Sequence, residues 1–483
     1  MTNRIASRIG AALGVALVAG SLAGCVDFTG AGLDSDPNSP TAATRGQLFI
    51  AMQIAGQNNM SGNLVAVTWM QQMAGVNRQF LSVGRYEFDE NSADYGSYYS
   101  GGGLASLRLL EASARVINDK ALLGIAQVYE AMTMAHAADA WGDIPYVQAV
   151  DYVAFPTPAL DRQDTVYGRL QSLLDSGINN LQAPGSFAGP GARDLVYGGD
   201  KTKWIAMAHT LKARLHLHVA EVGGAPAYAN AAVQAALGIA SAAGDYSTYQ
   251  STTVGEENGW FGFRRGRGTD IAAGKYLVDL MAARGDPRLA EYFAPAPQAP
   301  PAADSIKGAA PGDEDDGTQS WLSDTRGAAD FRQPLVTYAE NAHILAEAQT
   351  TARGGAGDAT ALATLNAYRI SIGFPVLAGA TACGGVPCTG TALLQEILTS
   401  KYIALFQHIE VWNDYKRTCW PNLAPNATAV APNTRIPARF YYGANERLTN
   451  PNIPSVATQQ AQFRNRMDPV NATTIGGGVC LGN

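Results

Sequence analysis

The sequence predicts a mainly α-helical protein that carries long irregular loops. Apolar residues recur at intervals of three and four along most of the chain, as in Leu104, Leu107, Leu110 and Ala114, which places them on one helical face. Strand-like alternation of apolar and polar residues is scarce. Stretches rich in Gly, Pro, Asn and aromatic residues separate the periodic segments, and we expect these stretches to be loops.

The composition is that of a folded globular chain. Of the 483 residues, 47% are hydrophobic and 16% are charged, and the formal net charge is −7. Nucleic-acid binding is disfavoured because it needs a concentrated basic surface. The same charge disfavours attachment to an anionic membrane through a polybasic segment.

The N-terminus predicts export and lipidation. Arg4 and Arg8 precede a short apolar run, which is followed by Leu22-Ala23-Gly24-Cys25. The run is too short to span a bilayer, so residues 1–24 form a removed signal peptide. Leu-Ala-Gly-Cys matches the bacterial lipobox, in which Cys25 receives acyl chains such as palmitate that anchor the protein to a membrane. The alternative is an ordinary signal peptide that happens to precede a cysteine.

The mature chain divides into a tether and one large helical unit. Residues 25–45 are rich in Gly, Pro, Asp and Ser, which predicts a lipidated tether, and residues 46–483 form a single superdomain. Ala-rich helix pairs separated by short turns fit degenerate tetratricopeptide packing, although no clean repeat of about 34 residues can be overlaid. Periodicity predicts helices within residues 104–114, 122–135, 166–174, 203–222, 227–241, 275–284, 335–352, 359–370 and 393–416.

Four stretches resist helix assignment: residues 60–103, 243–274, 285–334 and 417–483. The first three hold many aromatic residues, and long loops of this kind are often functional. Aromatic rings pack on sugar faces while Asn and Arg bind hydroxyl pairs, so these loops suit ligand capture. The alternative is that the aromatic residues attach loops to the core. The predicted ligand-binding residues are Trp69, Asn77, Arg78, Tyr86, Trp260, Arg264 and Trp321.

Besides Cys25, the chain has four cysteines, an even number that an oxidising compartment favours. Four cysteines can pair in three ways. We prefer Cys383 with Cys388, across a Gly-Gly-Val-Pro turn, and Cys419 with Cys480. A zinc site is a weak alternative, because there is no second close pair or nearby histidine.

No catalytic constellation stands out, so we expect neither an enzyme nor a cofactor or resident metal. The short motifs of serine hydrolases, zinc proteases and nucleotide-binding proteins are absent from the sequence. His343 and Glu347 have metal-ligand spacing on a helix, but ordinary helical roles explain them better. The acidic run Asp313–Asp316 lacks the spacing of a calcium loop and is expected to be solvated.

Six short motifs follow one another along the mature chain. They are Asp36–Asn38, Ala140–Tyr146, Thr165–Leu181, Tyr338–Ala348, Lys401–Arg417 and Arg435–Pro437 with Glu446 and Asn450–Asn452. In these motifs and their order the chain resembles the SusD/RagB family of surface nutrient-binding lipoproteins over nearly its whole mature length. Gln407 stands where members often have glutamate.

The resemblance implies a function as well as a fold. It implies a helical protein with tetratricopeptide-like pairs, lipid-anchored on the outer face of an outer membrane. Such a protein captures an oligosaccharide or peptide and delivers it to a SusC-like TonB-dependent barrel transporter. Two alternatives remain: a surface glycoside hydrolase, which needs a carboxylate pair in an aromatic cleft, and a tetratricopeptide-type scaffold for outer-membrane assembly.

Overall fold

The computed structural model describes residues 43–61, 63–296, 305–431, 433–461, 464–469 and 480. Contacts divide the chain into Met1–Gln47 and Leu48–Asn483, and the fold belongs to the second unit. The expected signal peptide and Cys25 lie outside the described residues.

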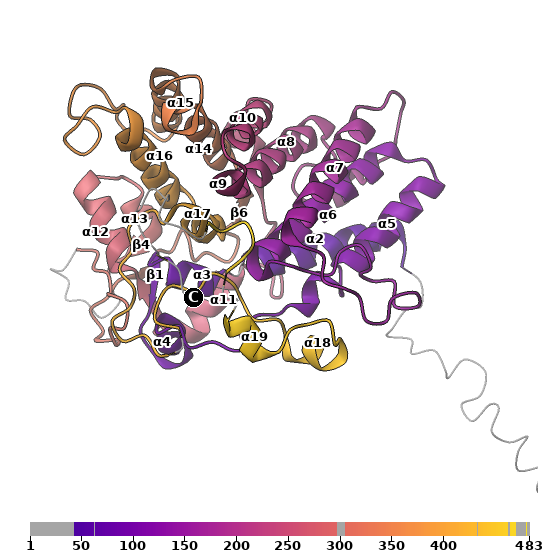
Figure 1. Cartoon of the computed structure of the whole chain (residues 1–483), viewed down its shortest axis with the longest axis horizontal. Helices are drawn as coiled ribbons and strands as arrows, with labels where there is room; N and C mark the ends of the chain where they lie inside the picture. Colours follow the sequence, from indigo (N-terminus) through magenta and orange to yellow (C-terminus); the bar gives the residue numbers. More distant parts are fainter. Residues whose placement is uncertain are drawn as a thin grey trace, which may run out of the picture. The chain divides into compact units, whose positions relative to one another are not determined.

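The described residues form a mainly α-helical structure, as the sequence predicts (Figure 1). Four short 3-10 helices lie between α-helices of the described residues. They are η1 (Gly96–Tyr98), η2 (Gly191–Arg193), η3 (Ala242–Gly244) and η4 (Thr351–Arg353). The α-helices are α2 (Arg45–Ser61), α3 (Leu64–Trp69), α4 (Arg78–Gly84), α5 (Leu104–Val116), α6 (Lys120–Trp141), α7 (Gln163–Gln182), α8 (Lys201–His218), α9 (Ala220–Gly223), α10 (Ala225–Ala235), α11 (Gly259–Arg267), α12 (Lys275–Arg284), α13 (Leu289–Tyr292), α14 (Tyr338–Gln349), α15 (Asp358–Ser371), α16 (Gly390–Ala404), α17 (Glu410–Thr418), α18 (Ala444–Thr449) and α19 (Val456–Ala461).

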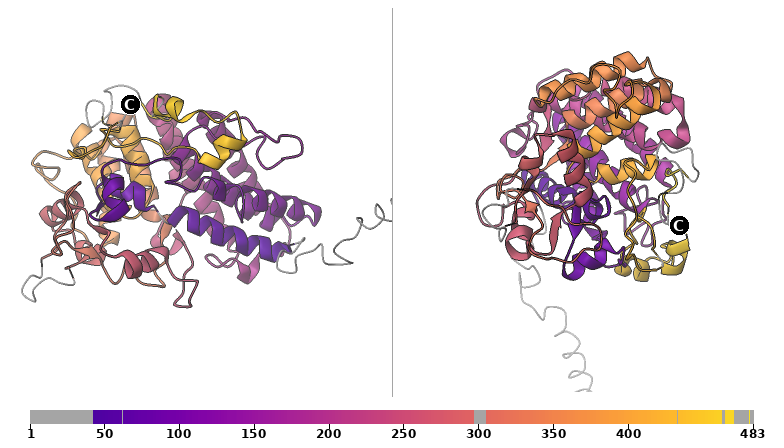
Figure 2. Two further views of the ribbon diagram at one scale, coloured as in Figure 1. Left: turned by 90° about the horizontal axis from the view of Figure 1, so that it is seen from below. Right: turned by 90° about the vertical axis from the view of Figure 1, so that its left-hand side faces the viewer.

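Neighbouring helices pack as successive pairs. Helix α6 lies between α5 and α7, α8 packs on both α7 and α10, and α14 contacts α10, α15 and α16 (Figure 1). This arrangement is the tetratricopeptide-like packing expected from the Ala-rich sequence. The yellow C-terminal segment lies beside the indigo and purple N-terminal helices (Figure 2), where Phe440 contacts both Trp69 and Trp141.

Helix α6 is the centre of this packing. The Asp119 side chain caps its start by accepting a hydrogen bond from Leu122 N at 3.0 Å. Nearly every residue of α6 is buried, because other helices cover all its faces. Gly124 allows α7 to approach closely: a Cβ there would lie 2.8 Å from Gly177 O. Any larger residue at position 124 would push the two helices apart.

Three two-stranded antiparallel sheets connect the loops. Strand β1 (Met73–Gly75) pairs with β3 (Ile271–Ala273), with Met73 opposite Ala273. Strand β2 (Tyr246–Ser247) pairs with β6 (Pro334–Val336), and β4 (Phe293–Ala294) pairs with β5 (Trp321–Leu322). Each pairing brings together two distant stretches of sequence.

The structure differs from the helix prediction in several places: residues 203–222 form α8 and α9, the helix predicted to reach residue 241 ends at Ala235, and residues 335–336 belong to strand β6. Residues 393–416, predicted as one helix, form α16 and α17 with a break at Gln407, whose φ is +66°. The side chains of Gln72 and Gln333 bind the backbone N–H and C=O of Gln407, at 3.2 Å in each case, and stabilise this break. The stretches expected to be irregular contain the short helices α3, α4, α11, α13, α18 and α19.

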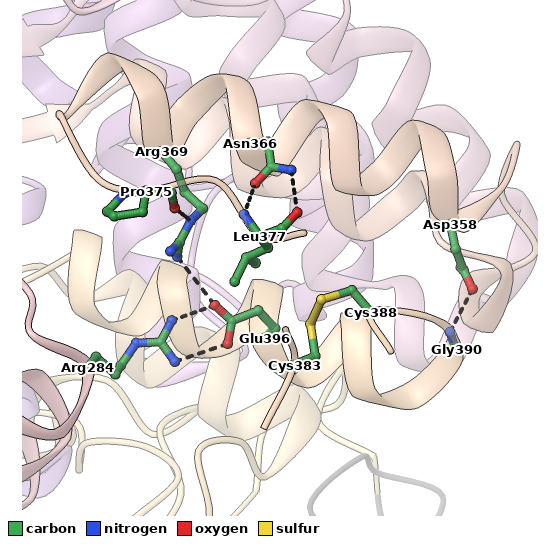
Figure 3. The surroundings of a disulfide bond; sticks show 10 residues. All are labelled: Arg284, Asp358, Asn366, Arg369, Pro375, Leu377, Cys383, Cys388, Gly390 and Glu396. Atoms are coloured by element: carbon green, nitrogen blue, oxygen red, sulfur yellow. Dashed lines mark hydrogen bonds and ion pairs between the residues drawn. A yellow bond between two sulfur atoms is a disulfide. The ribbon is translucent and has the colours of Figure 1, made fainter. Parts of the chain in front are cut away.

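The described cysteines form two disulfides, Cys383–Cys388 and Cys419–Cys480. Figure 3 shows that the first lies beside α15 and α16. There Asn366 binds the backbone of Leu377 through both its amide N–H and its carbonyl oxygen. Glu396 of α16 forms an ion pair with Arg284 of α12, so this corner of the fold is joined by covalent and ionic contacts.

Polar contacts also run through the core. Arg214 of α8 binds Glu340 of α14 through Nε and Nη2, both at 2.5 Å, and these side chains are 7% and 1% exposed. Such pairs join helices that the apolar core also packs together. Among the described helices, none is long and apolar enough to cross a membrane.

Candidate functional site

Two hollows flank the indole ring of Trp321. The larger has a volume of about 440 Å³ and the smaller about 230 Å³, and both include Gly268, Thr269 and Trp321 in their walls. The larger is completed by side chains of α11, and the smaller by β3, by Val76 after β1 and by the loop that contains Asp315. We refer to the two hollows together as the Trp321 site.

Helix α11 is positioned by a polar cap and an apolar anchor. The Asn258 side chain accepts a hydrogen bond from Trp260 N at 2.7 Å and donates to Phe331 O at 2.8 Å. Trp260 is buried and anchors the first turn in the core. The outer face of α11 then carries Phe261 and Arg264, and both line the larger hollow.

Trp321 is partly exposed and its orientation is stabilised from one side. Strand β5 places it opposite Ala294 of β4. The guanidinium of Arg264 lies over its ring, 4.8 Å from the centroid, and also pairs with Asp324 at 2.6 Å. Gly268 packs against the same ring, because a Cβ there would lie 3.0 Å from Trp321 Cζ3. The ring is therefore orientated before any ligand arrives.

A buried carboxylate organises the base of the site. Asp270 is fully buried and pairs with Arg78, whose Nε donates to Oδ1 at 2.7 Å. Arg267 lies 3.5 Å from the other carboxylate oxygen of Asp270. Arg78 also approaches the Thr269 hydroxyl, at 3.5 Å. Because two arginines occupy Asp270, its role is to position them.

The chemistry of the site suits a polar ligand with apolar faces. Trp321 and Phe261 offer aromatic surface, while Thr269 and Arg265 offer a hydroxyl and a guanidinium beside it. Arg265 lies over Phe261 at 5.4 Å from its centroid, and its side chain is 68% exposed. Sugars present this combination of C–H faces and hydroxyl edges.

A second polar cluster lies in the core and consists of Asp139, His218 and Glu410. Within the part of the chain that the structure describes, these three side chains are the one group whose ligand atoms lie close enough together to hold a metal ion. His218 uses both ring nitrogens: Nε2 lies 2.7 Å from Glu410 and Nδ1 lies 2.9 Å from Asp139. Burial alone would lower the pKa of His218, but the two carboxylates raise it to about 10. The arrangement is therefore an imidazolium between two carboxylates, which stabilises the core.

The model of a SusD-like family, described as starch-binding and associating with outer membrane, matches residues 37–443. The chain belongs to the SusD-like family. No curated protein matches this SusD-like chain.

Solved structures of SusD-like proteins share the fold. A SusD/RagB family protein from Bacteroides thetaiotaomicron is 21% identical with a TM-score of 0.68, and the match covers 91% of this chain and all of that one. A second SusD-like protein from the same organism is 20% identical with a TM-score of 0.72, over 91% and 99% of the two chains. A chitin-binding SusD homologue from Flavobacterium johnsoniae is 20% identical with a TM-score of 0.69, over 88% and 98%.

The structure separates the seven predicted ligand-binding residues of this SusD-like chain into two groups. Arg264 and Trp321 line the Trp321 site, and Arg78 lies next to it through Asp270 and Thr269. Asn77 caps α4, where its side chain accepts from Arg78 N at 2.9 Å, so it supports the position of Arg78.

The other three predicted residues lie in the core and line neither hollow of the Trp321 site. Trp69 is 1% exposed and donates from Nε1 to Val83 O at 3.1 Å. Tyr86 is 2% exposed, its hydroxyl accepts from Asn426 N, and burial raises its pKa to about 12. Trp260 is 2% exposed. These three side chains are buried because aromatic residues in the segments between the long helices pack against the core and attach those segments to it.

Sequence reasoning did not select Thr269, Asp270 or Gly268 for the site. Thr269 and Asp270 lie a few positions after the predicted residue Arg264, in a stretch that also contains Arg265 and Arg267. Phe261 and Arg265 are sequence neighbours of the predicted residues Trp260 and Arg264. The missing signal is the contact between Asp270 and Arg78, which are 192 positions apart.

Proposed function

We propose that this chain is a cell-surface lipoprotein that binds an oligosaccharide at the Trp321 site and delivers it to a SusC-like TonB-dependent outer-membrane transporter. The observation that carries the proposal is the oriented, partly exposed Trp321 ring between two hollows that polar side chains border. One homologue of similar fold is a chitin-binding protein, which supports a glycan over a peptide.

The two hollows suit a chain of sugars better than one sugar. Because they share Trp321, Gly268 and Thr269, a ligand with two or more linked rings can place a unit on either side of the indole. Aromatic surface contributes contact area without charge selectivity, and Arg265 and Thr269 donate hydrogen bonds to hydroxyl groups. This arrangement supports binding of an oligosaccharide.

The proposal includes lipid attachment through Cys25 and a location on the outer membrane. Support comes from the lipobox Leu22–Cys25 and from a family whose description includes association with the outer membrane. Several acyl chains give firm anchoring, so no spanning helix is needed. SusD-like proteins are binding proteins, and Asp270, the buried carboxylate beside the hollows, is occupied by Arg78 and Arg267.

The test is a pull-down of the tagged full-length protein from mildly solubilised outer membranes, followed by mass spectrometry. The proposal expects a TonB-dependent barrel in roughly equimolar amount and acyl chains on the N-terminal cysteine. A Cys25→Ala variant is the control, and we expect it to leave the membrane fraction. Recovery of β-barrel assembly factors without a transporter, or glycan cleavage by the purified protein, would overturn the proposal.

A further inference from the structure

A separate pocket opens between the end of α2, the segment around η1, and the second half of α6. Its volume is about 390 Å³, within the range of about 300–1,000 Å³ that small-molecule sites occupy. It has no lining residue in common with the Trp321 site. Its exposed lining is polar, with Asn58 and Asp94, and its buried wall is aromatic, with Tyr98, Trp141 and Phe440.

His136 belongs to the buried wall, and its hydrogen bonds define its tautomer. The Tyr98 hydroxyl donates to Asn59 O at 3.1 Å, so its single proton is used there. The 2.7 Å contact between Tyr98 Oη and His136 Nδ1 then requires a proton on Nδ1. Burial lowers the pKa of His136 to about 4, which keeps the ring neutral. Nε2 is therefore a bare hydrogen-bond acceptor.

Two polar atoms of the lining residues are buried and have no hydrogen-bond partner. One is His136 Nε2, on a side chain that is only 9% exposed, and the other is Asn59 Nδ2. The Tyr98 hydroxyl contacts His136 Nδ1 and the backbone carbonyl of Asn59, so the two residues belong to the same part of the pocket wall. Buried polar groups of folded proteins are nearly always paired, and because these two belong to residues that line a pocket, a ligand there can supply the partner. A hydroxyl group can donate to one atom and accept from the other.

The charges of the side chains that line this pocket limit the class of ligand that it can bind. Asp94 is the charged side chain among the lining residues, and neither Lys nor Arg is among them. An anion has no cationic partner here, and the lone pair of His136 Nε2 would repel it. The aromatic wall made by Trp141 and Phe440 favours the C–H face of a ring. The geometry points to a second binding site for a neutral, hydroxyl-rich ring, a single sugar unit, recognised by His136 and Asn59.

This site is independent of the oligosaccharide site proposed above. The experiment uses the Trp321→Ala variant of the full chain as its background, so that the first site is weakened in every sample. Binding of D-glucose and of N-acetyl-D-glucosamine is measured by saturation-transfer difference NMR and by calorimetry. His136→Phe removes the acceptor and keeps an aromatic ring. Ala93→Phe fills the pocket from a half-buried lining position, and it serves if His136→Phe does not fold.

We expect one sugar to bind the Trp321→Ala protein with one-to-one stoichiometry. His136→Phe and Ala93→Phe should each weaken that binding by about tenfold or more, the loss of a hydrogen bond or of the pocket volume. His209→Phe, at a half-buried histidine of α8 outside the pocket, is the matched control and should bind as the background does.

Three results would overturn the inference: neither sugar binds the background variant, or both pocket variants bind as well as the control, or a sugar-soaked crystal holds only water beside His136 Nε2. These results leave the proposed function intact if the natural protein still binds oligosaccharides. Failure of the proposed function alone can also be recognised. In that case oligosaccharide binding fails, but monosaccharide binding that depends on His136 still supports the second site.

Discussion

Arg417 of α17 and Glu347 of α14 form a buried bidentate ion pair. Nη1 donates to Oε1 at 2.7 Å and Nη2 donates to Oε2 at 2.6 Å, and the side chains are 2% and 0% exposed. Burial alone would lower the pKa of Arg417, but Glu347 and Asp414 raise it well above its usual value. The pair joins two helices that are 70 positions apart in sequence.

The first prediction is that Glu347→Gln strongly destabilises the protein. The substitution leaves the Arg417 charge buried with less compensation, and removal of one partner from a buried pair typically costs about 3–5 kcal/mol. Chemical denaturation monitored by circular dichroism measures the change. The control is Asp279→Asn, which breaks the exposed pair with Lys275, whose side chains are 54% and 59% exposed, and should change stability little. Equal effects of the two variants would contradict the role assigned to Arg417.

The second prediction concerns pH and His218. Its pKa is about 10 in the folded protein, above the unfolded value of about 6.5. The charged ring therefore contributes its full stability below about pH 6.5, and this contribution is lost as the pH rises toward about 10. We expect the free energy of unfolding to fall between pH 7 and pH 10 more steeply in the natural protein than in His218→Gln. Parallel pH profiles for the two proteins would show that the ring is neutral in the fold.

The third prediction compares the two disulfides. Cys383 and Cys388 are 5 positions apart, whereas Cys419 and Cys480 are 61 apart. Because a longer closed loop restricts the unfolded chain more, removing the first bridge should cost about 2 kcal/mol and the second about 4 kcal/mol. Cys383→Ala/Cys388→Ala and Cys419→Ala/Cys480→Ala are compared by denaturation, with a reducing agent present in a second series. Reduction should lower the free energy of unfolding of the natural protein below that of either variant. The opposite ranking of the two variants would disagree with the loop-length argument.

Sequence periodicity predicts the helical framework because it depends on local spacing. The apolar face of α5, the position of α6 and the class of the fold all follow from residues close in sequence. The break between α16 and α17 does not follow, because no Gly or Pro marks it. It depends on Gln72 and Gln333, which reach Gln407 from distant segments.

The candidate site is harder to predict from sequence, because it also depends on contacts between residues that are far apart in the chain. Composition identifies aromatic and Arg-rich loops, but exposure decides whether an aromatic ring binds a ligand or packs in the core. Trp260 and Trp321 look equivalent in sequence, yet one is 2% exposed and the other is partly exposed between two hollows. The role of Asp270 emerges only when β1 pairs with β3, which brings Arg78 beside it.

The last prediction uses this contrast to separate binding from folding. Trp321→Ala removes the ring shared by both hollows, and we expect oligosaccharide binding to weaken by about tenfold or more, the effect of about 1.4 kcal/mol. Stability should change little, because the ring is partly exposed. Trp260→Ala should instead cost about 3–5 kcal/mol of folding free energy, as for a large buried side chain. Calorimetric titration with chito-oligosaccharides and malto-oligosaccharides measures binding, and thermal unfolding measures stability. If Trp321→Ala binds normally, the hollows beside it are not the glycan site. If it unfolds as readily as Trp260→Ala, Trp321 is a packing residue like the other tryptophan, and any loss of binding would reflect loss of the fold.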